Sequence, residues 1–114
     1  MTIKDIIPIL KAELLCGEDR LDTELLSVCG ADMMSDVLAY VKDQSVLLTG
    51  LINPQVVRTA EMMDMRCIVF VRGKTPDEQV VRLAEQRDIV LLCSPLRMFT
   101  ACGVLYEAGL KGES

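Results

Sequence analysis

Three apolar runs of this chain end at a polar residue and a proline, after which a helical pattern begins. The junctions are SVLLTGLINP (45–54), RCIVFVRGKTP (66–76) and IVLLCSP (89–95). A short run rich in β-branched residues is typical of a buried strand, and proline is favoured in the first turn of a helix. Repeated strand–helix units indicate a parallel sheet with helical crossovers. We therefore expect an α/β fold in which strands 45–49, 67–72 and 89–93 run parallel, with helices on both faces.

The other expected elements follow from the spacing of apolar residues. Short strands are predicted at 12–17 and 23–29. One helix is predicted to begin after Thr2, with Asp5 as its capping-box partner, and another after Asp32. Three further helices are predicted at 54–64, 76–87 and 95–108. The helix after Asp32 is expected to bury Met33, Met34, Val37, Leu38 and Val41, and the last helix Leu96, Phe99, Cys102 and Leu105. Connections are short and there is no linker, so we expect a single domain over residues 1–114.

Composition excludes several classes of function. The net charge is −5 and the twelve Lys and Arg residues are scattered, which argues against a nucleic-acid partner. No apolar run approaches the roughly 20 residues of a membrane span. The five cysteines lack C-x-x-C spacing and histidine is absent, which argues against a metal site and favours free thiols in a reducing cytoplasm. We expect a soluble cytoplasmic protein without a cofactor.

The string Gly73-Lys74-Thr75 resembles the end of a phosphate-binding P-loop, but the spacing is wrong. The full pattern requires a glycine five positions before the second one, where this chain has Ile68. Thr75 with Glu78 fits a capping box, and Pro76 fits the first helical position. The interpretation is a helix start, and a nucleoside triphosphatase is not expected.

Polar residues nevertheless follow each strand of the expected parallel sheet. In open parallel sheets, ligands bind beyond the carboxyl ends of the strands. The candidate ligand-binding residues there are Thr49, Gly50, Asn53, Arg72, Gly73, Lys74 and Ser94, together with Asp32. Hydroxyls, an amide, two cations and helix N-terminal amides at one edge would suit a small anion. The alternative is that Asn53, Thr75 and Ser94 are helix caps and that Arg72 and Lys74 only solvate a loop.

No catalytic residues are predicted. Asp32 and Asp36 lie four residues apart, and two carboxylates can perform acid–base chemistry when their pKa values differ. An N-cap aspartate followed by an acid in the first turn explains the same spacing without a reaction. A Cys–His nucleophile is excluded because the chain has no histidine.

Several segments resemble those of DRTGG domains, and the resemblance covers nearly the whole chain. The segments are TIKDIIPIL, LLCGED, DMMSDVLAYVK, GLINPQVVRTAEMMDM, VFVRGKTPDEQVVRLAEQRDIVLLCSP and LYEAGL. Of the motif that names the family, only Asp22 is clearly retained, and Leu26-Ser27-Val28 stands where relatives have T-G-G. The role of those glycines in relatives therefore does not transfer to this chain.

The resemblance implies a three-layer α/β/α sandwich similar to the N-terminal domain of HPr kinase/phosphorylase, often dimeric, with a regulatory rather than catalytic role. It further implies a link to hydrogenase or redox metabolism. The leading hypothesis is a non-catalytic, dimeric regulatory domain that senses a small anionic or nucleotide-like ligand. The alternatives are a protein-interaction module that docks on a larger redox or kinase partner, and a small phosphotransferase or hydrolase using Asp32 and Asp36.

Overall fold

A five-stranded, mostly parallel sheet forms the centre of the molecule. The computed structural model describes residues 1–40 and 45–111. The strands are β1 (Glu13–Cys16), β2 (Ser27–Gly30), β3 (Ser45–Thr49), β4 (Cys67–Phe70) and β5 (Val90–Cys93), in the order β1-β5-β4-β3-β2. Neighbours from β2 to β5 pair in parallel, and β1 pairs antiparallel with β5. The α/β fold expected from the three strand–proline junctions is confirmed.

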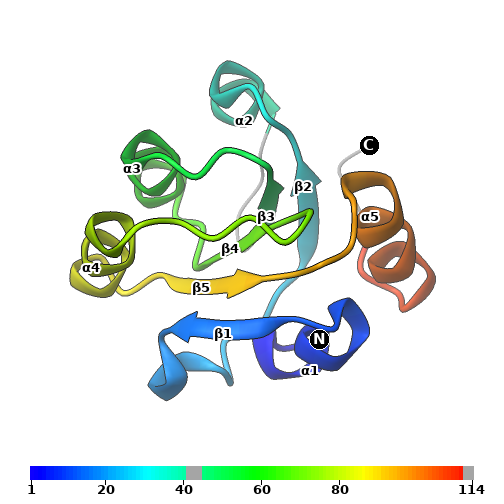
Figure 1. The fold of residues 1–114 in the computed structure, drawn as a ribbon. Coiled ribbons are helices and arrows are strands. Elements are labelled where there is room, and N and C mark those ends of the chain that lie inside the picture. The colour runs from blue at the N-terminus through cyan, green and yellow to red at the C-terminus, as the bar shows by residue number, and fades with distance from the viewer. Residues whose placement is uncertain (41–44, 112–114) are drawn as a thin grey trace.

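Helices cover both faces of this sheet, as Figure 1 shows. The helices are α1 (Ile3–Leu10), α2 (Met34–Tyr40), α3 (Pro54–Met62), α4 (Glu78–Gln86) and α5 (Met98–Glu107), with a 3₁₀ turn η1 (Glu18–Arg20). Helices α2, α3 and α4 pack on one face, and α1 and α5 pack on the other. The result is a three-layer α/β/α sandwich.

Two mainly aliphatic cores lie between the layers because successive strand residues point to opposite faces. Along β3, Leu47 joins the core under α2–α4, whereas Val46 and Leu48 join the core under α1 and α5. All five residues of β3 are buried. A parallel strand covered on both faces therefore has a continuous apolar sequence, as the three predicted runs do.

Two predicted helix starts are confirmed. Thr2 and Asp5 form a reciprocal capping box at α1, and the hydrogen bonds from the Thr2 amide and hydroxyl lower the pKa of the Asp5 carboxyl. Asn53 caps α3 by accepting from the Val56 amide, and Pro54 is the first helical residue. Pro8 lies within α1, which is only eight residues long.

Three other predicted helix starts are wrong. Thr75 does not cap α4; Asp77 does, by accepting from the Val80 amide, because the chain first forms a turn after β4. Helix α5 begins at Met98 rather than at residue 95. Helix α2 begins at Met34, and Asp32, two residues earlier, uses its carboxylate elsewhere. The strand expected at 23–29 is also shorter, since β2 covers only Ser27–Gly30.

The predicted inward faces of α2 and α5 are partly wrong. Phe99 is 90% exposed, Met33 64% and Leu38 44%, although Val37 and Leu105 are fully buried as expected. Helix α5 is apolar around most of its circumference, so periodicity does not select the face that packs on the sheet. Val41 lies outside the described residues. No helix in the described part of the chain is long and apolar enough to cross a membrane.

Candidate functional site

The carboxyl ends of β2, β3, β4 and β5 lie at one edge of the sheet because these strands are parallel. Each strand is followed there by a loop that leads to a helix or a turn (Figure 1). Of the eight residues predicted for this edge, the structure brings four into direct proximity: Asp32, Thr49, Gly50 and Arg72. We call these four residues the strand-end cluster.

Asp32 links the loop after β2 to the loop after β3. Its Oδ1 accepts a 2.7 Å hydrogen bond from the Gly50 amide and a 3.2 Å bond from the Thr49 hydroxyl. Thr49 Oγ1 in turn accepts from the Leu51 amide at 3.1 Å. Thr49 and Gly50 are buried and form the floor of the cluster, whereas Asp32 is exposed. The donors of this floor therefore converge on a single anionic oxygen.

Arg72 is held in a strained backbone conformation next to that floor. Residues Val71–Lys74 form a turn closed by a 3.3 Å bond from the Lys74 amide to the Val71 carbonyl, and the φ angles of Arg72 and Gly73 are 61° and 68°. A positive φ is unusual for arginine and carries a cost of the order of 1–3 kcal/mol. The Arg72 amide bonds to the Leu96 carbonyl at 2.7 Å, which ties this turn to the loop after β5.

The Arg72 guanidinium lies against Gly50. A Cβ placed on Gly50 would be 2.5 Å from Arg72 Nη2 and 3.4 Å from Asp32 Oδ1, so the cation and the carboxylate both lie beside the same backbone position. They do not form an ion pair, and the guanidinium has no hydrogen-bond or ion-pair partner among residues 1–40 and 45–111. The cluster therefore combines backbone and hydroxyl donors with a guanidinium that lies near the Asp32 carboxylate but forms no ion pair with it.

The other four predicted residues have different positions. Ser94 is fully buried, and its hydroxyl donates to the Leu10 carbonyl at 2.7 Å and accepts from the Leu96 amide at 3.2 Å. The Asn53 side chain is used as the α3 cap. Gly73 and Lys74 are exposed in the turn, and the Lys74 carbonyl accepts from the Cys93 thiol at 3.1 Å. The side chains of Ser94 and Asn53 thus form hydrogen bonds that stabilise the fold. For Asn53 this is the helix cap that the alternative interpretation of the sequence predicted.

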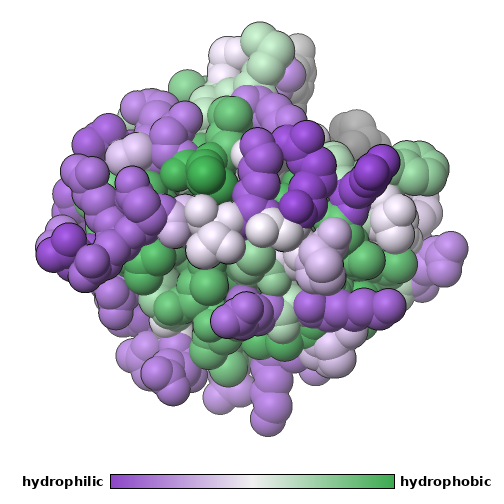
Figure 2. All heavy atoms as spheres, viewed as in Figure 1, coloured by the Kyte–Doolittle hydropathy of each residue, from purple (hydrophilic) through white to green (hydrophobic). Residues whose placement is uncertain are grey.

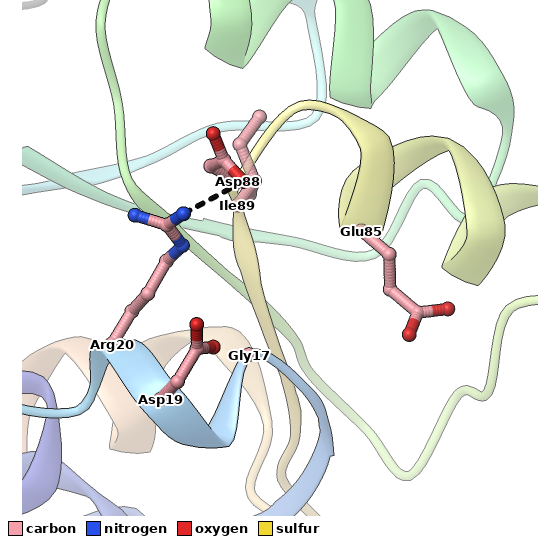
Figure 3. Close-up of a pocket in the computed structure, with 6 residues that line it drawn as sticks. All are labelled: Gly17, Asp19, Arg20, Glu85, Asp88 and Ile89. Carbon is pink, nitrogen blue, oxygen red and sulfur yellow. Dashed lines mark ion pairs between the residues drawn. The ribbon is translucent and has the colours of Figure 1, made fainter.

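A pocket of about 150 Å³ lies at the opposite edge of the sheet, where sequence reasoning placed no site. It is lined by Gly17, Asp19, Arg20, Glu85, Asp88 and Ile89. Arg20 extends toward Asp88 and forms an ion pair of 2.8 Å, whereas Glu85 points away from that pair (Figure 3). The ion pair joins the turn after β1 to the turn before β5. The one feature of the sequence that indicates a turn at this pocket is Gly17, which ends the run ELLCG.

The described residues contain no group of histidine, cysteine or acidic side chains arranged to hold a metal ion. Burial raises the pKa of the Cys67, Cys16 and Cys102 thiols. Raised thiol pKa values disfavour the nucleophilic thiolate. These three thiols are therefore poor candidates for a catalytic nucleophile.

Comparisons with known proteins point to one family. A family model for the DRTGG domain matches residues 5–108. The search of curated proteins found no match. Among solved structures, the chain is similar to the crystal structure of the CBS and DRTGG domains of the regulatory region of Clostridium perfringens pyrophosphatase, complexed with the activator diadenosine tetraphosphate.

That likeness has a TM-score of 0.75 at 19% sequence identity and covers 91% of this chain. It covers only 45% of the other chain, so this protein spans less than half the length of that regulatory region. At this identity the likeness shows the fold. The match to the family model extends over nearly all of the sequence, and the protein therefore belongs to the DRTGG domain family.

Proposed function

We propose that this domain is a non-catalytic regulatory module that binds a small anionic, nucleotide-like ligand at the strand-end cluster. The observation that carries the proposal is the convergence of the Gly50 amide, the Thr49 hydroxyl and the Arg72 guanidinium at one edge. Backbone amides and a guanidinium are the groups that recognise phosphate in proteins. The carboxyl edge of a parallel sheet is also where ligands bind in this class of fold.

The strain at Arg72 further supports the proposal. Strained backbone persists where the surrounding structure enforces it, and such sites are often functional. Here the hydrogen bonds from the Arg72 amide to the Leu96 carbonyl and from the Gly73 amide to the Ser94 carbonyl enforce the turn. The turn holds the guanidinium against Gly50. The regulatory region of the pyrophosphatase is complexed with a dinucleoside polyphosphate, which suggests this class for the first ligands to be tested.

The test is a thermal-shift and calorimetry panel of inorganic phosphate, adenine nucleotides and diadenosine tetraphosphate. A ligand at one hundred times its dissociation constant should add about 2.7 kcal/mol to the apparent stability. Arg72→Gln should weaken binding about tenfold or more, since it removes one charged contact worth roughly 1.5–3 kcal/mol. Arg66→Gln is the matched control, because Arg66 is exposed and precedes the opposite end of the same strand.

The absence of binding to every probe, in both the wild-type domain and Asp32→Asn, would contradict the proposal. Equal loss of binding in Arg72→Gln and Arg66→Gln would also contradict it, because the effect would then reflect only the net charge of the domain.

A second role, as an interaction module that forms a homodimer, is favoured by the exposed apolar side chains. Leu26, Met33, Leu38, Ile52, Met62, Phe99 and Tyr106 are all large and exposed. Hydrophobic residues reach the surface among hydrophilic ones on the face in Figure 2. Light scattering should give twice the monomer mass, and Phe99→Ser should shift the domain toward a monomer. A concentrated wild-type solution that stays monomeric would remove this second role.

A further inference from the structure

We propose that the Asp32 carboxylate is an internal competitor for the anion position of the strand-end cluster, which a phosphate group must displace in order to bind. This inference rests on the proposed function, because it concerns the same site. It adds that the chain itself occupies the donors of that site and so sets the affinity at which a ligand is sensed.

The first observation is that both floor donors end on one oxygen. The Gly50 amide lies 2.7 Å and the Thr49 hydroxyl 3.2 Å from Asp32 Oδ1. A phosphate oxygen and a carboxylate oxygen are equivalent acceptors for such donors, since both are anionic and accept short, charge-assisted hydrogen bonds. An anionic ligand that uses these donors must therefore take the place of Oδ1.

The second observation is that the Arg72 guanidinium, next to this oxygen, has no hydrogen-bond or ion-pair partner in the described part of the chain. Arg72 Nη2 and Asp32 Oδ1 both lie beside the same backbone position, Gly50, yet the two side chains form no ion pair. Asp32 thus accepts the hydrogen bonds of the two floor donors, and the guanidinium can still donate to an acceptor atom of a ligand. A phosphate group supplies both acceptors, one oxygen for the floor and another for the guanidinium.

The third observation is that the Asp32 side chain can rotate away from the two floor donors. Its side chain is exposed and lies in the short loop between β2 and α2, whereas the floor residues Thr49 and Gly50 are buried. Rotation of one exposed side chain frees the floor without rearrangement of the sheet. The ligand class is a phosphate group, which inorganic phosphate and the terminal phosphate of a nucleotide share.

The test compares Asp32→Asn with Asp36→Asn by calorimetry at an ionic strength of about 0.15 M, with inorganic phosphate and ATP as separate probes. Asp32→Asn removes the competing charge and keeps an amide oxygen at the floor. While Asp32 occupies the donors, the ligand binds only the fraction of molecules in which they are free, and its apparent affinity is reduced by that fraction. The dissociation constant of Asp32→Asn should therefore be about tenfold or more below that of the wild type. Asp36 is the matched control because it is an exposed acid in the first turn of α2, and Asp36→Asn should change the constant less than about twofold.

The amide resonance of Gly50 gives a second readout in the wild-type protein. Phosphate or ATP should shift it, since its acceptor changes from carboxylate to phosphate, and in Asp32→Asn the resonance should saturate at a lower ligand concentration. Tighter binding of ATP alone would identify a nucleotide as the source of the phosphate, whereas equal tightening for both probes would identify the phosphate group itself.

Several outcomes separate this inference from the proposed function. If Arg72→Gln weakens binding but Asp32→Asn leaves the dissociation constant unchanged or raises it, the site stands and the competitor is overturned. Equal tightening in Asp32→Asn and Asp36→Asn also overturns it, because the effect is then one of general charge. Binding in Asp32→Asn where the wild type shows none supports it. If neither protein binds any probe, both proposals fail.

Discussion

The guanidinium of Arg72 occupies the space in which any residue other than glycine would place its Cβ at position 50, with Nη2 only 2.5 Å from that point. The backbone of Gly50 is not left-handed, so a side chain at this position would conflict with the Arg72 guanidinium and not with the backbone conformation. The contact links two loops that are more than twenty residues apart in the sequence. It also makes binding and stability separable by mutation.

Gly50→Ala should weaken anion binding while changing stability little. The new methyl group meets the end of a flexible arginine side chain, which can move away and leave the cluster. We expect binding to fall about tenfold and the free energy of unfolding to change by less than about 1 kcal/mol. Calorimetry and urea denaturation measure the two effects. Gly103→Ala, where nothing lies within 4 Å of the new Cβ, is the control and should bind normally. Unaltered binding in Gly50→Ala would show that Arg72 does not act from this position.

Gly17→Ala should have the opposite profile, with a large loss of stability. Gly17 has a φ of +94°, and its Cβ would lie 2.7 Å from Val90 Cγ2 and 2.9 Å from Val90 Cα. Backbone strain and a clash with an immobile strand add, so we expect a loss of roughly 2–4 kcal/mol in the free energy of unfolding. The urea midpoint should fall without a change in the slope of the transition. A midpoint equal to that of Gly103→Ala would refute the close approach of these two segments.

Ser94→Ala should destabilise the fold even though the residue follows a strand at the candidate edge. Its hydroxyl is the donor to the Leu10 carbonyl and the acceptor for the Leu96 amide, and it is fully buried. Two buried polar groups would lose their partner, at an expected cost of about 1–3 kcal/mol. Chemical denaturation gives the loss, and anion affinity measured well below the transition should be unchanged. A stable variant with impaired binding would instead place Ser94 in the site.

The start of α4 can be tested with two neighbouring substitutions. Asp77→Ala should cost about 1 kcal/mol, because its carboxylate accepts from the Val80 amide, whereas Thr75→Ala should stay within about 0.5 kcal/mol of the wild type. Thermal unfolding of both variants distinguishes them. The reverse order would restore the capping box of Thr75 and Glu78 that the sequence predicts.

The buried thiol of Cys67 should make stability fall at high pH. Burial raises its pKa above the ordinary value of 9.0, because the thiolate is poorly solvated in the core. Above about pH 9 the unfolded chain releases this proton and the folded one retains it, so the free energy of unfolding falls as the pH rises. Below that pH the two states bind the same proton and stability is unaffected. Comparing urea midpoints from pH 8 to 10 with those of Cys67→Ala checks this, and parallel pH profiles in the two proteins would contradict it.

The central strands, and the edge at which the candidate ligand-binding residues lie, were predictable from local patterns. Buried parallel strands require continuous apolar runs, and Pro54 after Asn53 marks a helix start that depends only on neighbouring residues. The same reasoning failed at Thr75. Its local capping pattern lost to Asp77 because the 71–74 turn, held by bonds to the loop after β5, fixes where the helix can begin.

The face of α5 and the partners within the site were not predictable in this way. Phe99 fits the apolar stripe predicted for its helix but is exposed. Several faces of α5 are apolar, and the face that packs on the sheet is the one that carries Leu105. Asp32 had a local explanation as a helix cap, and only the pairing of β2 with β3 places it against Gly50. Ser94 and Leu10 are 84 residues apart, so no sequence pattern could reveal their bond.

From the sequence by itself come the parallel α/β architecture, the absence of a Cys–His nucleophile and the edge of the sheet that carries polar residues, because each depends on residue type and short-range spacing. Only the tertiary structure decided which of those polar residues lie together in the candidate site and which form hydrogen bonds within the fold. The physical reason is that hydrogen bonds and steric contacts between loops depend on strand register and turn geometry, which bring distant residues such as Asp32, Gly50 and Arg72 together.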